Sequence, residues 1–271
     1  ERFMYDGSLE SDNLWWIPLN YVVGSNPDYS ITKLDFWMVN KNMTLHSNSA
    51  PKPWGENDWL LFNIKATGYY RINYDKALWQ LLIDQLNAEN EGFKLIHYRN
   101  RAQLIDDAYN LARSERITYG ILFNLMSYLW QEIDYIPWVP VSRAGSDLNR
   151  RLSGSKIYEN YQKFIREIAA KLFNHLGVSW IDEESRTERY ARSIATSLAC
   201  QAQLPECLEK ANHELNEHVS HGKWIAPEYV GLIYCNGLRT ANALLFISMQ
   251  NRLLRSTDEV ERWNIIGGLA C

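Results

Sequence analysis

The sequence predicts an α+β protein with more than one domain, in which a small β-sandwich precedes an all-α domain of repeated helices. Two observations predict this division. Residues 1–74 hold short runs rich in Trp, Tyr, Ile and Val between clusters of Gly, Pro, Asn and Ser, a pattern typical of strands and turns. In residues 75–271, apolar side chains recur every three or four positions, which is typical of helices. We therefore expect a domain boundary between residues 74 and 75.

Four segments of the first part are predicted to be strands. They are LWWIPLNYVV (14–23), KLDFWMV (33–39), DWLLFNI (58–64) and GYYRINY (68–74). Four or five short strands in succession favour half of a β-sandwich. So few strands are stable only when they pack against another element.

Helical periodicity continues to the end of the chain and predicts about nine or ten helices of roughly 12–20 residues. The clearest helix, over residues 155–177, has an apolar stripe formed by Tyr158, Tyr161, Ile165, Ile168, Leu172 and Leu176. Ser155 is predicted to cap its start and Gly177 to end it, while Ser256 and Glu259 are predicted to form a capping box before the last helix. Because the helices follow one another without a fixed heptad, we expect paired helices stacked into a HEAT/ARM-like superhelix.

Both ends of the sequence predict a piece of a longer protein. Residues 1–8 are typical of the middle of a strand, so the sandwich is expected to lack its first strand. Residues 264–271 stop inside an apolar helical pattern, so the helical domain is expected to be truncated at its C-terminus.

Composition excludes several classes of protein. The chain has 271 residues, 46% of them hydrophobic, and a net charge of −4 without a basic block, so a nucleic-acid partner is not expected. No apolar run approaches the roughly 18 residues that span a bilayer. The four cysteines are an even number, and Asn42 begins the glycosylation sequon Asn-Met-Thr. Together these features favour an oxidising, extracellular compartment.

The segment ANHELNEHVSHG (211–222) has the composition of a metallopeptidase zinc motif, with His213, Glu214, Glu217, His218 and His221. A zinc helix needs two histidines four residues apart, because that step places both imidazoles on one face. His213 and His218 are five apart, about 140° around a helix. His218 and His221 are three apart, but Gly222 is predicted to end the helix there. We expect an exposed helix end and no metal ligand.

Two other charged clusters have ordinary structural explanations. Asp106 and Asp107 are adjacent, so on a helix they point about 100° apart and do not share a proton as a catalytic dyad does. A second cluster has arginines that could clamp a carboxylate, but glutamates alternate with them, which favours a self-paired, solvated face. Its members are Glu183, Glu184, Arg186, Glu188, Arg189 and Arg192. Neither cluster, nor any glycine-rich loop or local triad, predicts a catalytic or cofactor-binding residue.

The cysteines allow three pairings. Cys200 and Cys207 flank a turn marked by Pro205, which can bring their Cα atoms within bonding distance. Cys235 and Cys271 would then form the second bridge. The alternative, a four-thiolate zinc site, lacks the short Cys-x-x-Cys pairs that such sites use.

Several motifs, taken in order, resemble the aminopeptidase N family of zinc metallopeptidases (gluzincins), and the resemblance covers nearly the whole chain. They are GYYRINYD (68–75), NRAQLIDDAYNLA (100–112), YIPW (135–138), ACQAQLPEC (199–207) and IYCNGLR (233–239). The segment that ends in GYYRINYD is similar to the place where that family's small β-sandwich meets its C-terminal helical domain.

The resemblance implies that the parent is a cell-surface zinc aminopeptidase that removes N-terminal residues from peptides. The family's His-Glu-x-x-His helix, distal Glu and Gly-Ala-Met-Glu-Asn motif lie in an earlier domain and are absent from this sequence, so no catalytic, cofactor or metal residue is carried over. Zinc is implied for the parent only. Two family disulfides correspond to Cys200–Cys207 and Cys235–Cys271. Val230 replaces an arginine found in relatives, so any contact of that arginine is lost.

Three functions follow as hypotheses. The first is a segment, inactive alone, that caps the active-site cleft of an upstream catalytic domain and restricts the entry of peptide substrates. The second is a binding module of the ectodomain, for homodimerisation or for docking of a toxin, virus or antibody. The third, a helical-repeat adaptor of the cytosol, would have four free thiols and no glycan at Asn42.

Overall fold

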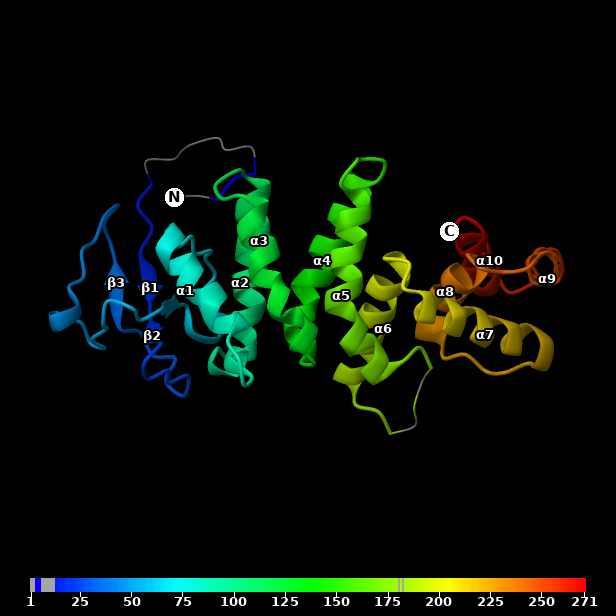
Figure 1. Cartoon of the computed structure of the whole chain (residues 1–271), viewed down its shortest axis with the longest axis horizontal. Coiled ribbons are helices and arrows are strands. Elements are labelled where there is room, and N and C mark those ends of the chain that lie inside the picture. Colours follow the sequence, from blue (N-terminus) through cyan, green and yellow to red (C-terminus); the bar gives the residue numbers. More distant parts are fainter. Residues whose placement is uncertain (1–2, 6–12, 180, 182) are drawn as a thin grey trace. The chain divides into compact units, whose positions relative to one another are not determined.

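The computed structural model describes residues 3–5, 13–179, 181 and 183–271 (Figure 1). Its strands are β1 (Ile17–Leu19), β2 (Tyr21–Val23), β3 (Phe36–Met38) and β4 (Leu60–Phe62). Its α-helices are α1 (Lys76–Asn87), α2 (Tyr98–Arg113), α3 (Tyr119–Met126), α4 (Tyr135–Leu152), α5 (Tyr158–Leu176), α6 (Arg186–Gln201), α7 (Pro205–His221), α8 (Pro227–Leu238), α9 (Ala243–Arg255) and α10 (Glu259–Leu269). Most of the strand expected over residues 1–8 lies outside the described residues.

The strands form two antiparallel pairs. β1 pairs with β3, with Pro18 opposite Trp37, and β2 pairs with β4, with Val22 opposite Leu61. Three of the predicted strand segments therefore contain strands, each only three residues long. The described strands make two separate two-stranded sheets, and the closed sandwich stays a prediction.

The strand predicted over residues 68–74 is wrong, because this segment finds its partners outside any sheet. The backbone N–H of Ile72 donates to Asp107 Oδ2 of α2 at 3.2 Å. The Tyr70 hydroxyl donates to the carbonyl of Pro18 at 2.9 Å. The Asp107 carboxylate thus accepts a backbone hydrogen bond that a neighbouring strand would accept in a sheet. Local β-propensity cannot reveal such a distant partner.

Buried asparagines join the strands to the first helices. Asn20 Oδ1 accepts from the Ile64 N–H at 2.8 Å, and Asn100 Nδ2 donates to the Asn63 carbonyl at 2.9 Å. Asn63 itself has a φ of 61°, a left-handed conformation that asparagine tolerates better than most residues. Because buried amides are costly unless they are hydrogen-bonded, this network fixes the chain path into α1 and α2.

The helical expectation from residue 75 onward is confirmed, with corrections at two ends. The apolar stripe of α5 is buried from Tyr161 to Leu176, and Gly177 ends the helix with a φ of 70°. The predicted cap at Ser155 is wrong, because α5 begins two residues later, after Ile157. The predicted capping box before α10 is also wrong.

Asp258 caps α10 in place of the predicted box. Its carboxylate accepts from the N–H groups of Val260 and Glu261. Ser256 lies shortly before it and donates its hydroxyl to Glu261 Oε2 at 2.6 Å. Aspartate satisfies the free N–H groups of a first turn as well as serine does, so either residue fits the same sequence pattern.

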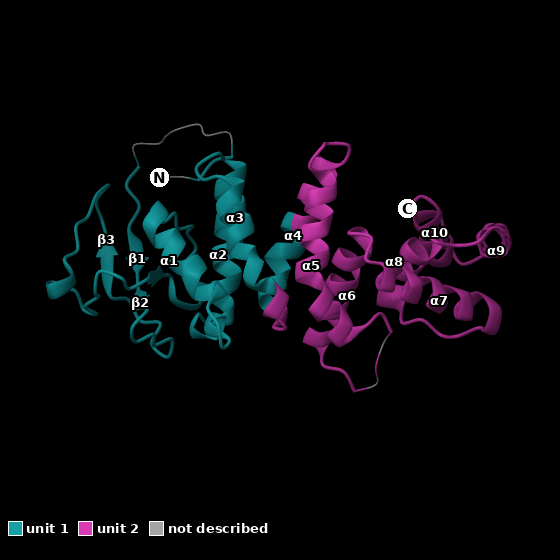
Figure 2. Cartoon of the chain, viewed as in Figure 1, with its two compact units in different colours: residues 1–129, 136–144 teal, residues 130–135, 145–271 magenta. Residues whose placement is uncertain are grey.

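The chain divides into two compact units (Figure 2). The first contains residues 1–129 and 136–144, and the second contains residues 130–135 and 145–271. In the first unit, α1 contacts α3 and α2 contacts α3. In the second, α5 packs against α6, α7 against α8 and α8 against α10. The boundary expected at residue 74 and the superhelical repeat stay predictions.

In the described part of the protein, no helix combines the length and the apolar character needed to cross a bilayer.

Candidate functional site

The histidine-rich segment forms the end of α7. His213 is exposed, and His221 lies 3.3 Å from the Glu217 carboxylate, measured from Nδ1 to Oε1. The helix ends at Gly222, which has the predicted left-handed conformation with a φ of 69°. His218 is held between two groups, with Nδ1 2.7 Å from the Lys223 carbonyl and Nε2 3.0 Å from the Tyr234 hydroxyl. Both ring nitrogens of His218 therefore secure the end of α7.

The acidic neighbours of these histidines also have partners. Glu214 forms an ion pair with Lys223 at 2.7 Å and accepts from the Ser179 hydroxyl at 2.9 Å. Within the described ranges, no group of three or more His, Cys, Asp or Glu side chains is placed to hold a metal ion. The zinc that the family resemblance implies does not fit the donors of the described residues.

Asp106 and Asp107 are brought together with Arg71. Arg71 Nη1 lies 2.6 Å from Asp106 Oδ2 and 3.1 Å from Asp107 Oδ1. The Asp107 side chain is 5% exposed, compared with 36% for Asp106. Burial raises the pKa of Asp107 to about 7, and the backbone bond from Ile72 and the Arg71 charge oppose that rise. The pair fastens residues 71–72 to α2, the structural role expected for it.

This burial gives a testable pH dependence. The folded-state pKa of about 7 exceeds the ordinary 3.8 of aspartate, so between these values the folded protein holds more protons at Asp107 than the unfolded protein. The free energy of unfolding therefore falls as the pH rises through this window, by up to about 1.4 kcal/mol per pH unit from this group. Asp107→Asn should remove this contribution, as measured by urea unfolding from about pH 5 to about pH 8.

The matched control is Asp106→Asn, which changes the same ion pair at a more exposed carboxylate. It should leave the slope of stability against pH close to that of the unchanged protein. Equal slopes for Asp107→Asn and the unchanged protein would contradict the assignment.

The arginine and glutamate cluster departs from the solvated face that was expected. Glu188 completes a capping box with Ser185 at the start of α6. Arg186 Nε donates to the Tyr190 hydroxyl at 3.0 Å. Both Glu188 and Arg186 are exposed as expected, but their partners are a serine and a tyrosine and not the charged members of the cluster.

Arg192 and Glu184 form a buried ion pair, so the solvated-face prediction is wrong for them. Their side chains are 2% and 4% exposed, and Arg192 Nη2 donates to Glu184 Oε1. Arg192 Nε and Nη1 and Glu184 Oε2 have no hydrogen-bond partner among the described residues. The alternating charges did not reveal the burial, because burial is set by how α6 packs on α5 and α8.

The four cysteines form the bridges Cys200–Cys207 and Cys235–Cys271. Both cysteines of the first bridge are fully buried, and the second bridge spans a sequence separation of 36 that includes α9 and α10. Asn42 is exposed in a segment without regular structure, and Val230 is half-buried on α8. Glycosylation at Asn42 stays a prediction.

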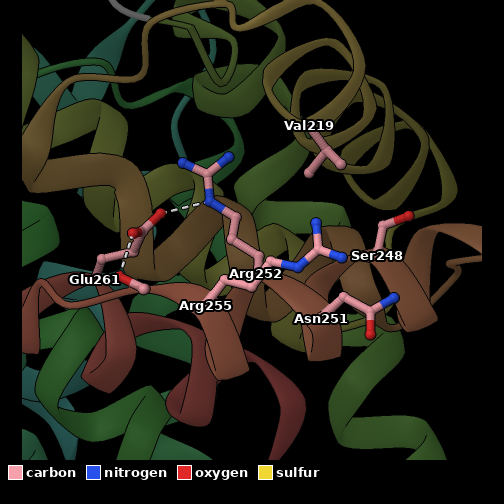
Figure 3. Close-up of a pocket in the computed structure, with 7 residues that line it drawn as sticks. Val219, Ser248, Asn251, Arg252, Arg255 and Glu261 are labelled. Carbon is pink, nitrogen blue, oxygen red and sulfur yellow. Dashed lines mark hydrogen bonds and ion pairs between the residues drawn. The ribbon is translucent and has the colours of Figure 1, made fainter.

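A polar cleft that sequence reasoning missed lies in the second unit, with a volume of about 510 Å³ (Figure 3). It is formed where the end of α7, the last turns of α9 and the start of α10 meet. Its lining residues are Val219, Ser248, Asn251, Arg252, Arg255, Ser256 and Glu261. Arg252 Nε donates to Glu261 Oε1, and the Arg255 guanidinium extends toward Asn251 and Ser248 (Figure 3). The spacing of residues 248, 251, 252 and 255 on one helix face is the signal that could have found it.

A second cleft of about 520 Å³ in the same unit lies between the segment after α5 and α7, and its lining is more apolar. Its lining residues include Ile181, Lys210, His213 and Glu214. Glu214 is already paired with Lys223, and the Lys210 ammonium lies 5.2 Å from the centre of the Phe173 ring. These charges serve local packing.

Comparison of the sequence with known proteins identifies a family and several relatives. Residues 59–271 match the family model described as the ERAP1-like C-terminal domain. The full sequence aligns with aminopeptidase N of Plutella xylostella at 32% identity, over 28% of that protein. It also aligns in full with membrane alanyl aminopeptidase of Heliothis virescens at 28% identity and with thyrotropin-releasing hormone-degrading ectoenzyme of Rattus norvegicus at 30%, over 26% of each. The sequence thus spans about a quarter of the length of these relatives.

Proposed function

We propose a function from one premise: this protein belongs to the ERAP1-like C-terminal domain family. In our proposal, it is the C-terminal segment of a cell-surface zinc aminopeptidase that removes N-terminal residues from peptides. The segment caps the cleft of an upstream catalytic domain and restricts which peptides enter. Closing such a cleft excludes water and substrates that do not fit, which changes both rate and selectivity.

The observation that carries this proposal is the alignment of the whole sequence with about a quarter of much longer aminopeptidases. Relatives named as a membrane aminopeptidase and as an ectoenzyme support an extracellular location. Two disulfides and an exposed Asn42 sequon fit the same compartment. The proposal assigns zinc and the catalytic residues to the upstream domain.

The segment alone should not hydrolyse an aminoacyl anilide, with or without added zinc, because its sequence lacks the His-Glu-x-x-His motif that supplies zinc ligands and the general base of this chemistry. The measurement is anilide turnover by the repurified protein, with a chelator-treated sample as the control. Turnover that survives repurification and disappears with the chelator would overturn the assignment.

The capping role needs a separate experiment. The upstream catalytic part, produced alone, should bind this segment, and binding should change its relative kcat/KM for a long peptide and a short anilide. The absence of binding, or binding with an unchanged ratio, would count against a cap.

A second candidate function is a binding module of the ectodomain, acting in homodimerisation or in docking of a toxin, virus or antibody. The exposed aromatic side chains near β1 and β3 favour it. Trp16 and Trp37 are 73% and 48% exposed, and their ring centres lie 6.4 Å apart. The test of the binding module is a pull-down in which this segment is used to capture a ligand that the full-length protein binds. Loss of capture in the variants Trp16→Ser and Trp37→Ser would assign the binding surface to these two side chains.

A further inference from the structure

The polar cleft between α7, α9 and α10 has donors that the fold leaves unused. Arg255 and Asn251 are exposed, and neither side chain has an ion pair or hydrogen bond within the described residues. They lie four residues apart on α9, so they share one helix face. Figure 3 shows the Arg255 guanidinium extending toward Asn251.

The one carboxylate among the described residues that line the cleft is already engaged. Glu261 Oε1 accepts from Arg252 Nε, and Glu261 Oε2 accepts from the Ser256 hydroxyl at 2.6 Å. Glu261 therefore holds Arg252 in place and cannot also neutralise Arg255. Ser248 donates its hydroxyl to the Leu244 carbonyl at 2.8 Å, so its proton is unavailable to a ligand.

Two charged groups beside the cleft in sequence, Arg262 and Asp258, already have partners. Arg262 Nη1 donates to the carbonyls of Leu253, at 2.8 Å, and Ser256, at 3.3 Å. The Asp258 carboxylate accepts from the N–H groups at the start of α10. This acidic group is thus used as a helix cap, while Arg255 has no acidic partner in the described residues.

We propose that this cleft binds a carboxylate, with two N–H groups of Arg255 donating in parallel to its two oxygens and Asn251 Nδ2 donating a third bond. A guanidinium matches the planar, two-oxygen shape of a carboxylate better than an ammonium does. The volume of about 510 Å³ is within the range of small-molecule sites, so the carboxylate would enter with an amino-acid-sized body. This proposal does not depend on the aminopeptidase assignment.

The carboxylate could belong to an acidic side chain or to the C-terminus of a peptide, and simple probes distinguish them. N-acetylglutamate α-amide carries a side-chain carboxylate, N-acetylalanine carries a terminal one, and N-acetylalanine amide carries none. Titration of the full 271-residue protein, followed by the NMR signals of the arginine Nε–H groups, should give a Kd on the order of 1 mM for one or both carboxylates. The neutral amide should bind at least about tenfold more weakly, and inorganic phosphate, which a guanidinium can also bind through two parallel hydrogen bonds, should bind no more tightly than the carboxylates.

Three variants complete the test. Arg255→Gln should weaken carboxylate binding by about tenfold or more, and Arg255→Lys by a smaller factor because it keeps the charge and loses the fork. Arg150→Gln, which removes a positive charge from an exposed arginine of α4, is the matched control and should leave the Kd unchanged. Equal binding of the neutral amide, preferential binding of phosphate, or a Kd that Arg255→Gln does not alter would each overturn the proposal.

Discussion

Replacing Arg192 with leucine should lower the free energy of unfolding by about 3–5 kcal/mol, because it leaves a buried carboxylate without its counter-charge. Glu184 is 4% exposed and receives a hydrogen bond from Arg192 Nη2. Removal of the guanidinium leaves that charge in a medium where solvation cannot replace the lost partner. In thermal unfolding, a loss of this size corresponds to a decrease in Tm of about 10 °C for a protein of this length.

Two further variants distinguish the loss of the buried ion pair from the effect of replacing any arginine in this unit. Arg150 is an exposed arginine that pairs with Asp147 at 2.8 Å in the same unit, so Arg150→Leu should cost less than about 1 kcal/mol. The double variant Glu184→Gln, Arg192→Met removes both charges and should recover much of the lost stability. The measurement is urea unfolding followed by far-UV circular dichroism. An Arg192→Leu effect no larger than that of Arg150→Leu, or a double variant no better than the single one, would show that the pair does not act as described.

The helices were predictable from the sequence because their signal is local. The apolar stripe of α5 repeats every three or four residues, and each of its members is buried or half-buried. Gly177 and Gly222 end their helices as predicted, since glycine adopts the positive φ of a helix end without strain. Helix starts were less predictable, because several polar side chains near one position can cap the same N–H groups.

Features that depend on contacts between distant segments were not predictable. The run GYYRINY has strong β-propensity, yet its partner is the carboxylate of Asp107 on α2. Arg192 follows Arg186 and Arg189 in an apparently solvated pattern, and only the packing of α6 buries it. The cleft beside Arg255 likewise needs three helices to meet. In each case the deciding neighbour lies outside the window in which periodicity can be read.

The disulfide pairing was accessible from spacing and from family resemblance together. Cys200 and Cys207 flank a turn, which made the first bridge plausible from geometry and left Cys235 to Cys271. The stability that each bridge supplies depends on a different quantity, the number of residues that it closes.

Loss of the Cys235–Cys271 bridge should lower the free energy of unfolding by about 4 kcal/mol, compared with about 2 kcal/mol for Cys200–Cys207, in the loop-entropy account. The two bridges close sequence separations of 36 and 7 residues. The longer one encloses α9 and α10, whose buried residues are few: Leu245, Met249, Ile265 and Gly268. Leu254 and Trp263 are 79% and 72% exposed, so these helices gain little stability from apolar burial.

The double variant Cys235→Ser, Cys271→Ser should therefore open α9 and α10 before the rest of the second unit. Hydrogen exchange of the backbone amides in these two helices should accelerate far more than exchange in α5, and trypsin should cleave first after Arg252 or Arg255. The double variant Cys200→Ser, Cys207→Ser is the control, because it removes the bridge that closes the short loop. Both of its cysteines are fully buried. Unchanged exchange in α9 and α10 without the longer bridge would mean that their own packing holds them. Serine hydroxyls buried at positions 200 and 207 add a desolvation cost of their own, so the place of fast exchange decides the test. Equal acceleration in α9 and α10 in both variants would mean that the longer bridge is not what holds these helices.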